Sequence, residues 1–359
     1  MHTVQPIGVL TLTHSSRETN LERCSVQLLT RRFADPARLA DPPPFDNLPP
    51  APTVYSGAVS FFLVFDDGTG RLHLRRLGSV RSRDRIQHAA VLASGDVLVG
   101  FQHRVVRWRP RLPIPELGQI NAMDFQVAAR FEHSYMAGLQ TVDPVGPERV
   151  AVSCSAPDAV LLLDAVEGKL ERVLRLPRDL YGRNYELTSG MDLRRHYIDD
   201  ELQVAQVNAA FGDRTGRYIA VSTLIQGAVG VFDLETGRYD EVTRGFVGAH
   251  GARFDDRGNL YFADSTTGTL VTLTEEGKIA RRFGTGARWL RDVQQLRGSI
   301  YAFALADANE LRVYDVDKDE LLFRATFTIW STENPDEGDP PVGWLGNSVQ
   351  AIGWRGFDE

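Results

Sequence analysis

The chain has 359 residues, with 47 acidic side chains against 40 Lys and Arg, which gives a net charge of −7. This balance excludes the broad basic surface that binds nucleic acid or an anionic membrane, whereas the 43% of hydrophobic residues suffices for a sizeable core. No segment resembles a secretory leader or a membrane span, and two cysteines provide neither a disulfide framework nor a zinc site. A cytoplasmic protein is therefore expected.

The N-terminal part of the chain predicts two strands, over Ile7 to Thr13 and Ser25 to Thr30. A Pro- and Asp-rich stretch at 33–52 then interrupts the pattern, and short apolar runs resume over Val54 to Val80. These runs are rich in β-branched and aromatic residues, which favours strands, but they show no copy of a complete repeat.

A repeat of strands and Gly/Asp turns follows along the rest of the chain. Its clearest copies are residues 208–222 (NAAFGDRTGRYIAVS) and 250–264 (HGARFDDRGNLYFAD), which align without a gap because Asn208 and His250 are 42 residues apart. Weaker copies contain strands at 96–100 and 105–108, at 149–153 and 160–164, and at 299–304 and 311–317. A period near 40 with three or four short strands is typical of propeller blades.

The repeats predict an all-β fold, a single β-propeller over residues 1–359. Residues 347–354 supply one more strand, and pairing it with the N-terminal strands would complete a blade and close the ring. The count is then six blades, and seven if Val54 to Val80 forms a blade of its own. A β-sandwich or jelly roll is the weaker alternative, since the turns are regularly spaced.

Three stretches depart from the repeat, at 33–52, 110–135 and 177–203. The last is dense in polar and aromatic groups, and it reads equally as a solvated loop or as a lid over the channel. From it we select four residues as candidate substrate-binding groups, together with Gln140: Tyr181, Tyr185, Arg195 and His196.

In a propeller the first residues of the innermost strands converge at one end of the central channel. Alignment of the repeats places six polar residues at or near these positions: His88, Gln140, Asn208, His250, Asp292 and Asn347. Imidazole, amide and carboxylate groups suit a divalent metal such as Ca, Zn or Fe, and we predict ligands among His88, Asn208, His250, Asp292 and Asn347. A polar channel that only holds ordered water remains the alternative.

The predicted catalytic groups are His250, His88 and Asp292, with His133 as a further base in the connection before Gln140. Histidine changes protonation near neutral pH, and a metal-bound water would serve as a nucleophile. No nucleotide cofactor is expected, because the glycine-rich runs lie in hairpin turns.

Residues 250–265 resemble the blades of the six-bladed superfamily that contains SMP-30/gluconolactonase, NHL and strictosidine-synthase-like proteins. The resemblance covers about Ile86 to Phe323. It implies a six-bladed propeller and, from its lactonase branch, a divalent metal in the channel, for which Asn208 and Asp292 match two of the ligand roles.

The resulting hypothesis is a small-molecule enzyme that acts at the channel mouth, with metal-dependent hydrolysis of a lactone or ester as the first reaction to test. A lyase or cyclase of a specialised pathway is one alternative. A non-catalytic propeller that binds a small ligand or a protein is the other, since one fold serves both roles.

Overall fold

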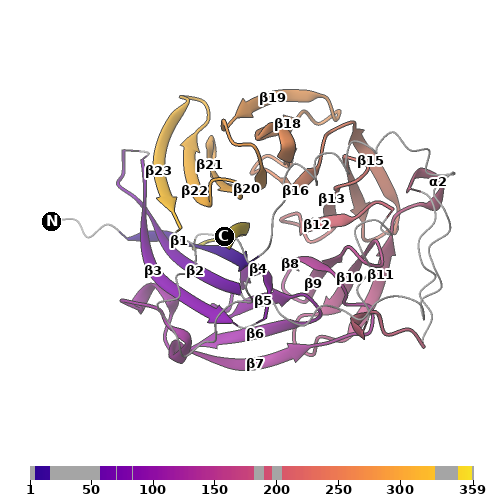
Figure 1. Ribbon diagram of the computed structural model, residues 1–359, viewed down its shortest axis with the longest axis horizontal. Coiled ribbons are helices and arrows are strands. Elements are labelled where there is room, and N and C mark those ends of the chain that lie inside the picture. Colours follow the sequence, from indigo (N-terminus) through magenta and orange to yellow (C-terminus); the bar gives the residue numbers. More distant parts are fainter. Residues whose placement is uncertain are drawn as a thin grey trace.

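A computed structural model describes residues 5–16, 57–69, 71–82, 84–181, 190–195, 204–327 and 347–357. These residues form six antiparallel sheets of four strands each, arranged around a central axis as the blades of a β-propeller (Figure 1). The prediction of an all-β propeller is confirmed, and the blade count is six.

Five blades follow one another along the chain, each with its first strand next to the axis and its fourth strand outermost. The first contains β4 (Ile86–Val91), β5 (Val97–Phe101), β6 (Val105–Pro110) and β7 (Phe125–Phe131). The second contains β8 (Leu139–Val145), β9 (Arg149–Cys154), β10 (Ala159–Asp164) and β11 (Leu170–Arg175). The third contains β12 (Val207–Gly212), β13 (Tyr218–Thr223), β14 (Ala228–Asp233) and β15 (Tyr239–Arg244). The fourth contains β16 (Ala249–Phe254), β17 (Leu260–Asp264), β18 (Thr269–Leu273) and β19 (Ile279–Gly284), and the fifth β20 (Leu290–Arg297), β21 (Ile300–Leu305), β22 (Glu310–Asp315) and β23 (Glu320–Thr326).

The sixth blade joins the two ends of the chain. Its inner strand is β24 (Asn347–Gly356), which pairs with β1 (Pro6–Ser16), and β2 (Gly57–Asp66) and β3 (Leu72–Ser82) complete the sheet. The predicted closure is therefore confirmed, and Val54 to Val80 supplies the outer strands of this blade rather than a seventh. The strand predicted at Ser25 to Thr30 lies outside the described residues.

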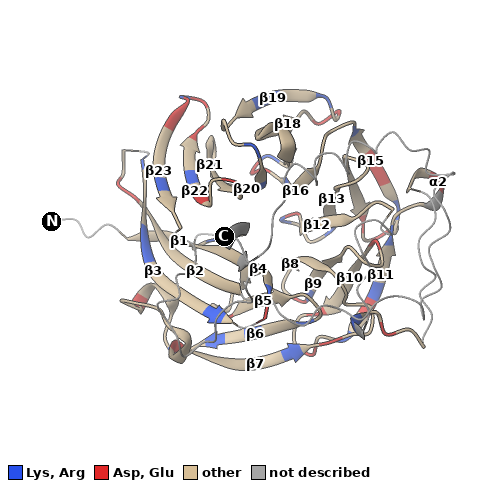
Figure 2. Cartoon of the chain, in the orientation of Figure 1, with Lys and Arg blue, Asp and Glu red and all other residues tan. Residues whose placement is uncertain are grey.

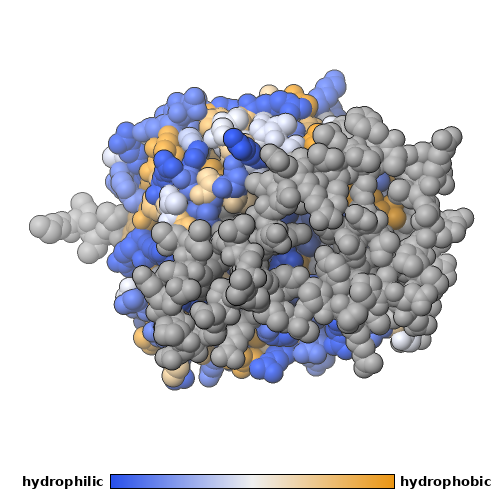
Figure 3. All heavy atoms as spheres, viewed as in Figure 1, coloured by the Kyte–Doolittle hydropathy of each residue, from blue (hydrophilic) through white to orange (hydrophobic). Residues whose placement is uncertain are grey.

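The apolar core lies between neighbouring blades. Phe61 of β2, for example, belongs to one buried cluster with Val99 of β5 and Trp108 of β6. Each Val, Leu or Phe buried in this way contributes about 1.5–3 kcal/mol relative to an exposed position. Charged residues lie mainly on the outer strands and turns (Figure 2), and the described surface around the rim of the viewed face is mostly hydrophilic (Figure 3). The blades thus hold one another in a ring.

The departures from the repeat fall at different places in the blades. The 110–135 stretch contains η3 (Ile114–Glu116), η4 (Ala122–Asp124) and β7, so its extra length lies within the first blade rather than between two blades. In 177–203 the structure describes α2 (Arg178–Tyr181) and η5 (Leu193–Arg195), while 33–52 lies outside the described residues. Within the described ranges, no helix has the length and apolar character that crossing a membrane requires.

Candidate functional site

A bulge near the start of the inner strand recurs in every blade. Each inner strand loses register with its neighbour by one residue there, and in five strands the unpaired residue is Gln87, Gln140, Asn208, Arg291 or Gln350. In β16 the irregularity comes just after His250, which holds the equivalent position. Because a bulge re-aims a side chain out of the sheet, these six positions form a ring of polar residues at one end of the channel, here called the mouth ring.

The mouth ring corrects the sequence alignment in three blades. Gln140, Asn208 and His250 hold the predicted positions, but the equivalent residues elsewhere are Gln87 in place of His88, Arg291 in place of Asp292 and Gln350 in place of Asn347. A bulge adds a residue without changing the apolar pattern, so alignment of the repeats misses it. The side chains of residues 347–350 lie outside the described ones.

Arg291 spans the mouth ring. Contacts between inner strands follow the order β4, β8, β12, β16, β20 and β24 around the axis, so β20 and β8 stand on opposite sides. From β20, the Arg291 guanidinium donates a hydrogen bond to His250 Nε2 of the neighbouring blade and another to Gln140 Oε1 of the opposite blade at 3.0 Å. A partly exposed cation therefore lies across the end of the channel.

The contacts of His250 fix its tautomer. Its Nδ1 lies 3.0 Å from the carbonyl oxygen of Gly248 and 2.6 Å from Ser265 Oγ. A carbonyl oxygen accepts but never donates, so Nδ1 carries the proton and Nε2 is left with a lone pair, which accepts from Arg291. His250 is thus a neutral imidazole whose basic nitrogen is directed to the guanidinium at the mouth.

Asn208 is held by its own blade and the next. Its Nδ2 donates to the carbonyl oxygen of Ala249 at 2.7 Å, and its Oδ1 accepts from Ser222 Oγ at 2.7 Å. Both ends of the amide are therefore used in joining β12 to β13 and β16, which favours a positioning role at the mouth ring over a ligand role.

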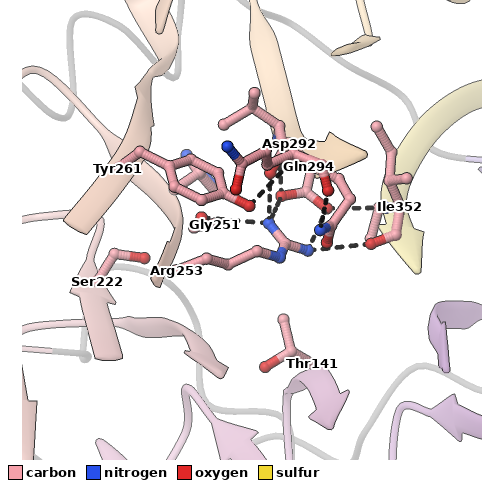
Figure 4. A network of polar contacts seen from close by, with 12 residues as sticks. Thr141, Ser222, Gly251, Arg253, Tyr261, Asp292, Gln294 and Ile352 are labelled. Carbon is pink, nitrogen blue, oxygen red and sulfur yellow. Dashed lines mark hydrogen bonds and ion pairs between the residues drawn. The ribbon is translucent and has the colours of Figure 1, made fainter. Parts of the chain in front are cut away.

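Below the mouth ring, a buried ion pair joins the adjacent inner strands β16 and β20 (Figure 4). Arg253 of β16 donates from Nη1 and Nη2 to the two carboxylate oxygens of Asp292 at 2.5 and 3.0 Å, and both residues are under 5% exposed. Further donation to the carbonyl oxygens of Val293 and Ile352 joins β20 and β24. A bidentate pair supported by such hydrogen bonds has the geometry that a buried salt bridge requires.

The backbone at Gly251 makes room for this pair. Gly251 has φ of +61°, and a Cβ at that position would lie 2.2 Å from Asp292 Oδ1. The Arg253 guanidinium also stacks on the Phe211 ring, with 3.6 Å between the guanidinium carbon and the ring centroid. Arg253, Asp292 and Phe211 thus form a floor under the mouth ring, here called the channel floor.

His88 lies on the axis between the mouth ring and the channel floor. Its ring contacts Phe211 edge-on at 5.4 Å between centroids, and neither ring nitrogen makes a hydrogen bond of normal geometry within the described residues. Burial and the nearby Arg253 charge lower the pKa of His88 to about 4, against weaker opposing effects of Asp292 and the backbone. His88 is therefore a neutral, buried imidazole at neutral pH.

The donor groups at the channel do not fit a divalent metal. In the part of the chain that the structure describes, no three His, Cys, Asp or Glu side chains come together as a metal site would need. Of the predicted ligands, Asp292 is bound by Arg253, Asn208 accepts from Ser222, and His250 accepts from a guanidinium. The predicted metal therefore stays a prediction, for which these donors provide no support.

The other predicted residues lie elsewhere. The Nδ1 atom of His133 accepts from the Tyr135 backbone at 3.2 Å, and burial with the nearby Arg194 lowers the pKa of His133. Tyr181 is 2% exposed and bonds Tyr239 and Glu241 of the outer strand β15, so it anchors the 177–203 connection away from the mouth. Tyr185, His196 and the side chain of Arg195 lie outside the described residues.

Sequence reasoning missed both arginines of the channel. Arg253 stands in the copy HGARF, three residues after His250, where a charge inside an otherwise apolar strand was the available signal. Arg291 directly precedes Asp292, and the bulge alone decides which of the two reaches the mouth.

No protein-family model and no curated protein matches the chain. Among solved structures it is similar to a chain of the nidogen/laminin complex, with 10% identity, a TM-score of 0.53 and coverage of 82% of this chain and 94% of that one. It is also similar to a protein of unknown function from Bacteroides caccae, with 11% identity, a TM-score of 0.51 and coverage of 86% of this chain and 97% of that one. A streptogramin B lyase matches with 11% identity, a TM-score of 0.47 and coverage of 76% of this chain and 80% of that one. At these identities the likeness shows the propeller fold alone.

Proposed function

We propose that this propeller is a small-molecule enzyme that binds a carboxylate-bearing substrate at the mouth ring. The observation that carries the proposal is the Arg291 guanidinium held across the channel by His250 and Gln140. Arg291 has further interactions besides these two hydrogen bonds, but both of these go to neutral acceptors, and a carboxylate is a stronger, bidentate partner for a guanidinium. A substrate carboxylate would therefore displace one or both of these contacts.

His250 would then act as the general base. Once the guanidinium turns to the substrate, the Nε2 lone pair can accept a proton, while Gly248 and Ser265 hold the Nδ1 proton in place. In hydrolysis of an ester or lactone, His250 takes a proton from the attacking water, the carbonyl carbon gains the hydroxyl, and the leaving oxygen receives the proton. A lyase or cyclase would use the same base to remove a proton from the substrate.

One observation favours a second function, carboxylate binding without turnover. His250 is only 2% exposed, so chemistry requires that Arg291 first move off it. If the guanidinium keeps both contacts in the complex, the mouth is a binding site and no base is released.

Binding comes first in the test. Calorimetric titration of the full chain with butyrate and hexanoate is expected to show that Arg291→Gln weakens binding about 10- to 100-fold, the range for a charged hydrogen bond. Arg288→Gln removes an exposed charge from the connection preceding β20 and serves as the matched control, with unchanged affinity. Equal affinities for wild type and Arg291→Gln would refute carboxylate binding at the mouth.

Turnover is then measured with lactones and carboxylate-bearing esters. His250→Gln is expected to keep the binding affinity and lose the hydrolysis, because its amide cannot accept a proton at neutral pH. Turnover that survives His250→Gln would remove the base assignment, and binding without any turnover would establish the binding module. Elemental analysis of the same protein tests the metal prediction separately.

A further inference from the structure

His88 is placed to contact a ligand that enters from the mouth ring. It lies one residue below Gln87 on β4, and its surroundings come from all the other inner strands: Val142 of β8, Phe211 of β12, Arg253 of β16, Asp292 of β20 and Ile352 of β24. A side chain on β4 with neighbours on every other inner strand must lie at the axis. It is also 1% exposed.

The two ring nitrogens of His88 have only weak backbone partners in the protein, at Val142 and Ile352. Neither makes a hydrogen bond of normal geometry within the described residues, and Arg253 Nε nearby is also without one. A buried polar group left unsatisfied costs about 1–3 kcal/mol. Such groups in native proteins normally face a water or a ligand.

We infer that His88 forms a second, deeper subsite that binds an uncharged hydroxyl group of the carboxylate ligand held at Arg291. This inference rests on the proposed function and names the substrate further: an elongated carboxylate with a hydroxyl group at its far end.

The chemistry of the site selects a hydroxyl over a second charge. A neutral imidazole offers one donor and one acceptor, and a hydroxyl matches either one. A second carboxylate would lie near Asp292, while both terminal nitrogens of Arg253 are already bonded to that carboxylate and to backbone carbonyls. An apolar end would leave both nitrogens of His88 unpaired.

The channel floor limits how far the ligand reaches. Arg253 stacks on Phe211 at 3.6 Å and is bonded to β20 and β24, so besides His88 the floor offers only Arg253 Nε as a buried polar atom without a partner among the described residues. The ligand is therefore bound at two points, with its carboxylate at the mouth and its hydroxyl at His88.

Matched pairs of simple acids test the inference by calorimetry on the full chain. The probes are butyrate, pentanoate and hexanoate against their 4-, 5- and 6-hydroxy derivatives. At least one hydroxy acid is expected to bind about two- to tenfold more tightly than its partner, the usual net effect of one hydrogen bond. His88→Phe should abolish this preference, so that each hydroxy acid binds no more tightly than its plain partner, whereas His88→Gln, which keeps a donor and an acceptor, should retain part of it.

Two outcomes distinguish a failure of the deep subsite from a failure of the proposed function. Loss of carboxylate binding in Arg291→Gln without any hydroxyl preference in the wild type would overturn the deep subsite and leave the proposed function standing. Absence of Arg291-dependent carboxylate binding would overturn both. If His88→Phe does not fold, ¹⁵N spectra of the wild type decide: the His88 ring nitrogens must shift on addition of the hydroxy acid and not of the plain acid, and equal shifts refute the subsite.

Discussion

The pKa of the Asp143 carboxyl group is strongly raised by its surroundings. It lies on the inner strand β8, and its Oδ2 accepts from the Gly212 backbone at 2.9 Å. Burial raises the pKa of Asp143 from 3.8 to about 7, against the lowering effects of this hydrogen bond and of Arg253. At neutral pH the group is thus divided between its charged and neutral forms.

This pKa predicts that Asp143 opposes folding at high pH. A carboxyl whose pKa is higher in the folded than in the unfolded state binds its proton more tightly in the folded state. Its effect is therefore absent below about pH 4, grows as the pH rises to about 7, and is constant above that. Asp143→Asn removes the charge and keeps an acceptor for Gly212. It is expected to increase the free energy of unfolding by about 2 kcal/mol at pH 8, discounted for partial solvent contact, and by little at pH 4.

Urea unfolding at the two pH values measures this difference. Asp240→Asn on the exposed part of the outer strand β15 is the matched control, for which the change should be small at both. A gain for Asp143→Asn that is the same at pH 4 and pH 8 would contradict the assigned protonation.

At the scale of strands, polar side chains connect inner strands to the neighbouring blades. The free edge of an inner strand faces the channel and must find partners for its backbone groups. Thr13 of β1 donates to the Gln87 carbonyl of β4 at 3.0 Å, Asn208 of β12 to the Ala249 carbonyl of β16, and Thr141 Oγ1 of β8 accepts from the Ala210 backbone of β12 at 3.0 Å. The blades are thus connected by hydrogen bonds as well as by apolar packing.

Thr141→Val tests this connection. Valine keeps the β-branched shape but leaves the buried N–H of Ala210 without its acceptor, so the free energy of unfolding should fall by about 1–3 kcal/mol. The same exchange at Thr243, on the outer strand β15, is the control and should cost under about 0.5 kcal/mol. Denaturant unfolding with equal losses at the two sites would show that the bond adds nothing between blades.

The repeat unit could be predicted from sequence because each blade reuses one pattern of apolar runs and Gly/Asp turns. The closure of the ring followed from the incomplete repeats at the two ends. The candidate site was harder to predict from the sequence. Arg291 and Gln87 reach the mouth in place of Asp292 and His88 because a bulge shifts the register by one residue. Pairing between neighbouring blades, as between Arg253 and Asp292, joins segments 39 residues apart and has no local signal.

At the scale of the whole molecule, the Arg253–Asp292 pair ties one side of the ring together. Arg253 belongs to β16, stacks on Phe211 of β12, pairs with Asp292 of β20 and donates to Ile352 of β24. The carboxylate of Asp292 also accepts from the Ile352 backbone N–H at 2.8 Å. Since β24 is the strand that closes the ring, the pair connects ring closure with the channel floor.

A double-mutant cycle on this pair tests that role. Arg253→Met leaves the Asp292 carboxylate buried without its counter-charge and should cost about 3–5 kcal/mol. Asp292→Asn should also be costly, because it leaves the Arg253 charge buried. The double variant Arg253→Met/Asp292→Asn removes both charges while the new amide oxygen still accepts from Ile352, so it should be more stable than Arg253→Met alone. Denaturant unfolding measures all four proteins, and losses that simply add would mean that the two residues act independently. In that case the closing strand would be held by its pairing with β1, and the polar floor would serve the ligand site without supporting the ring.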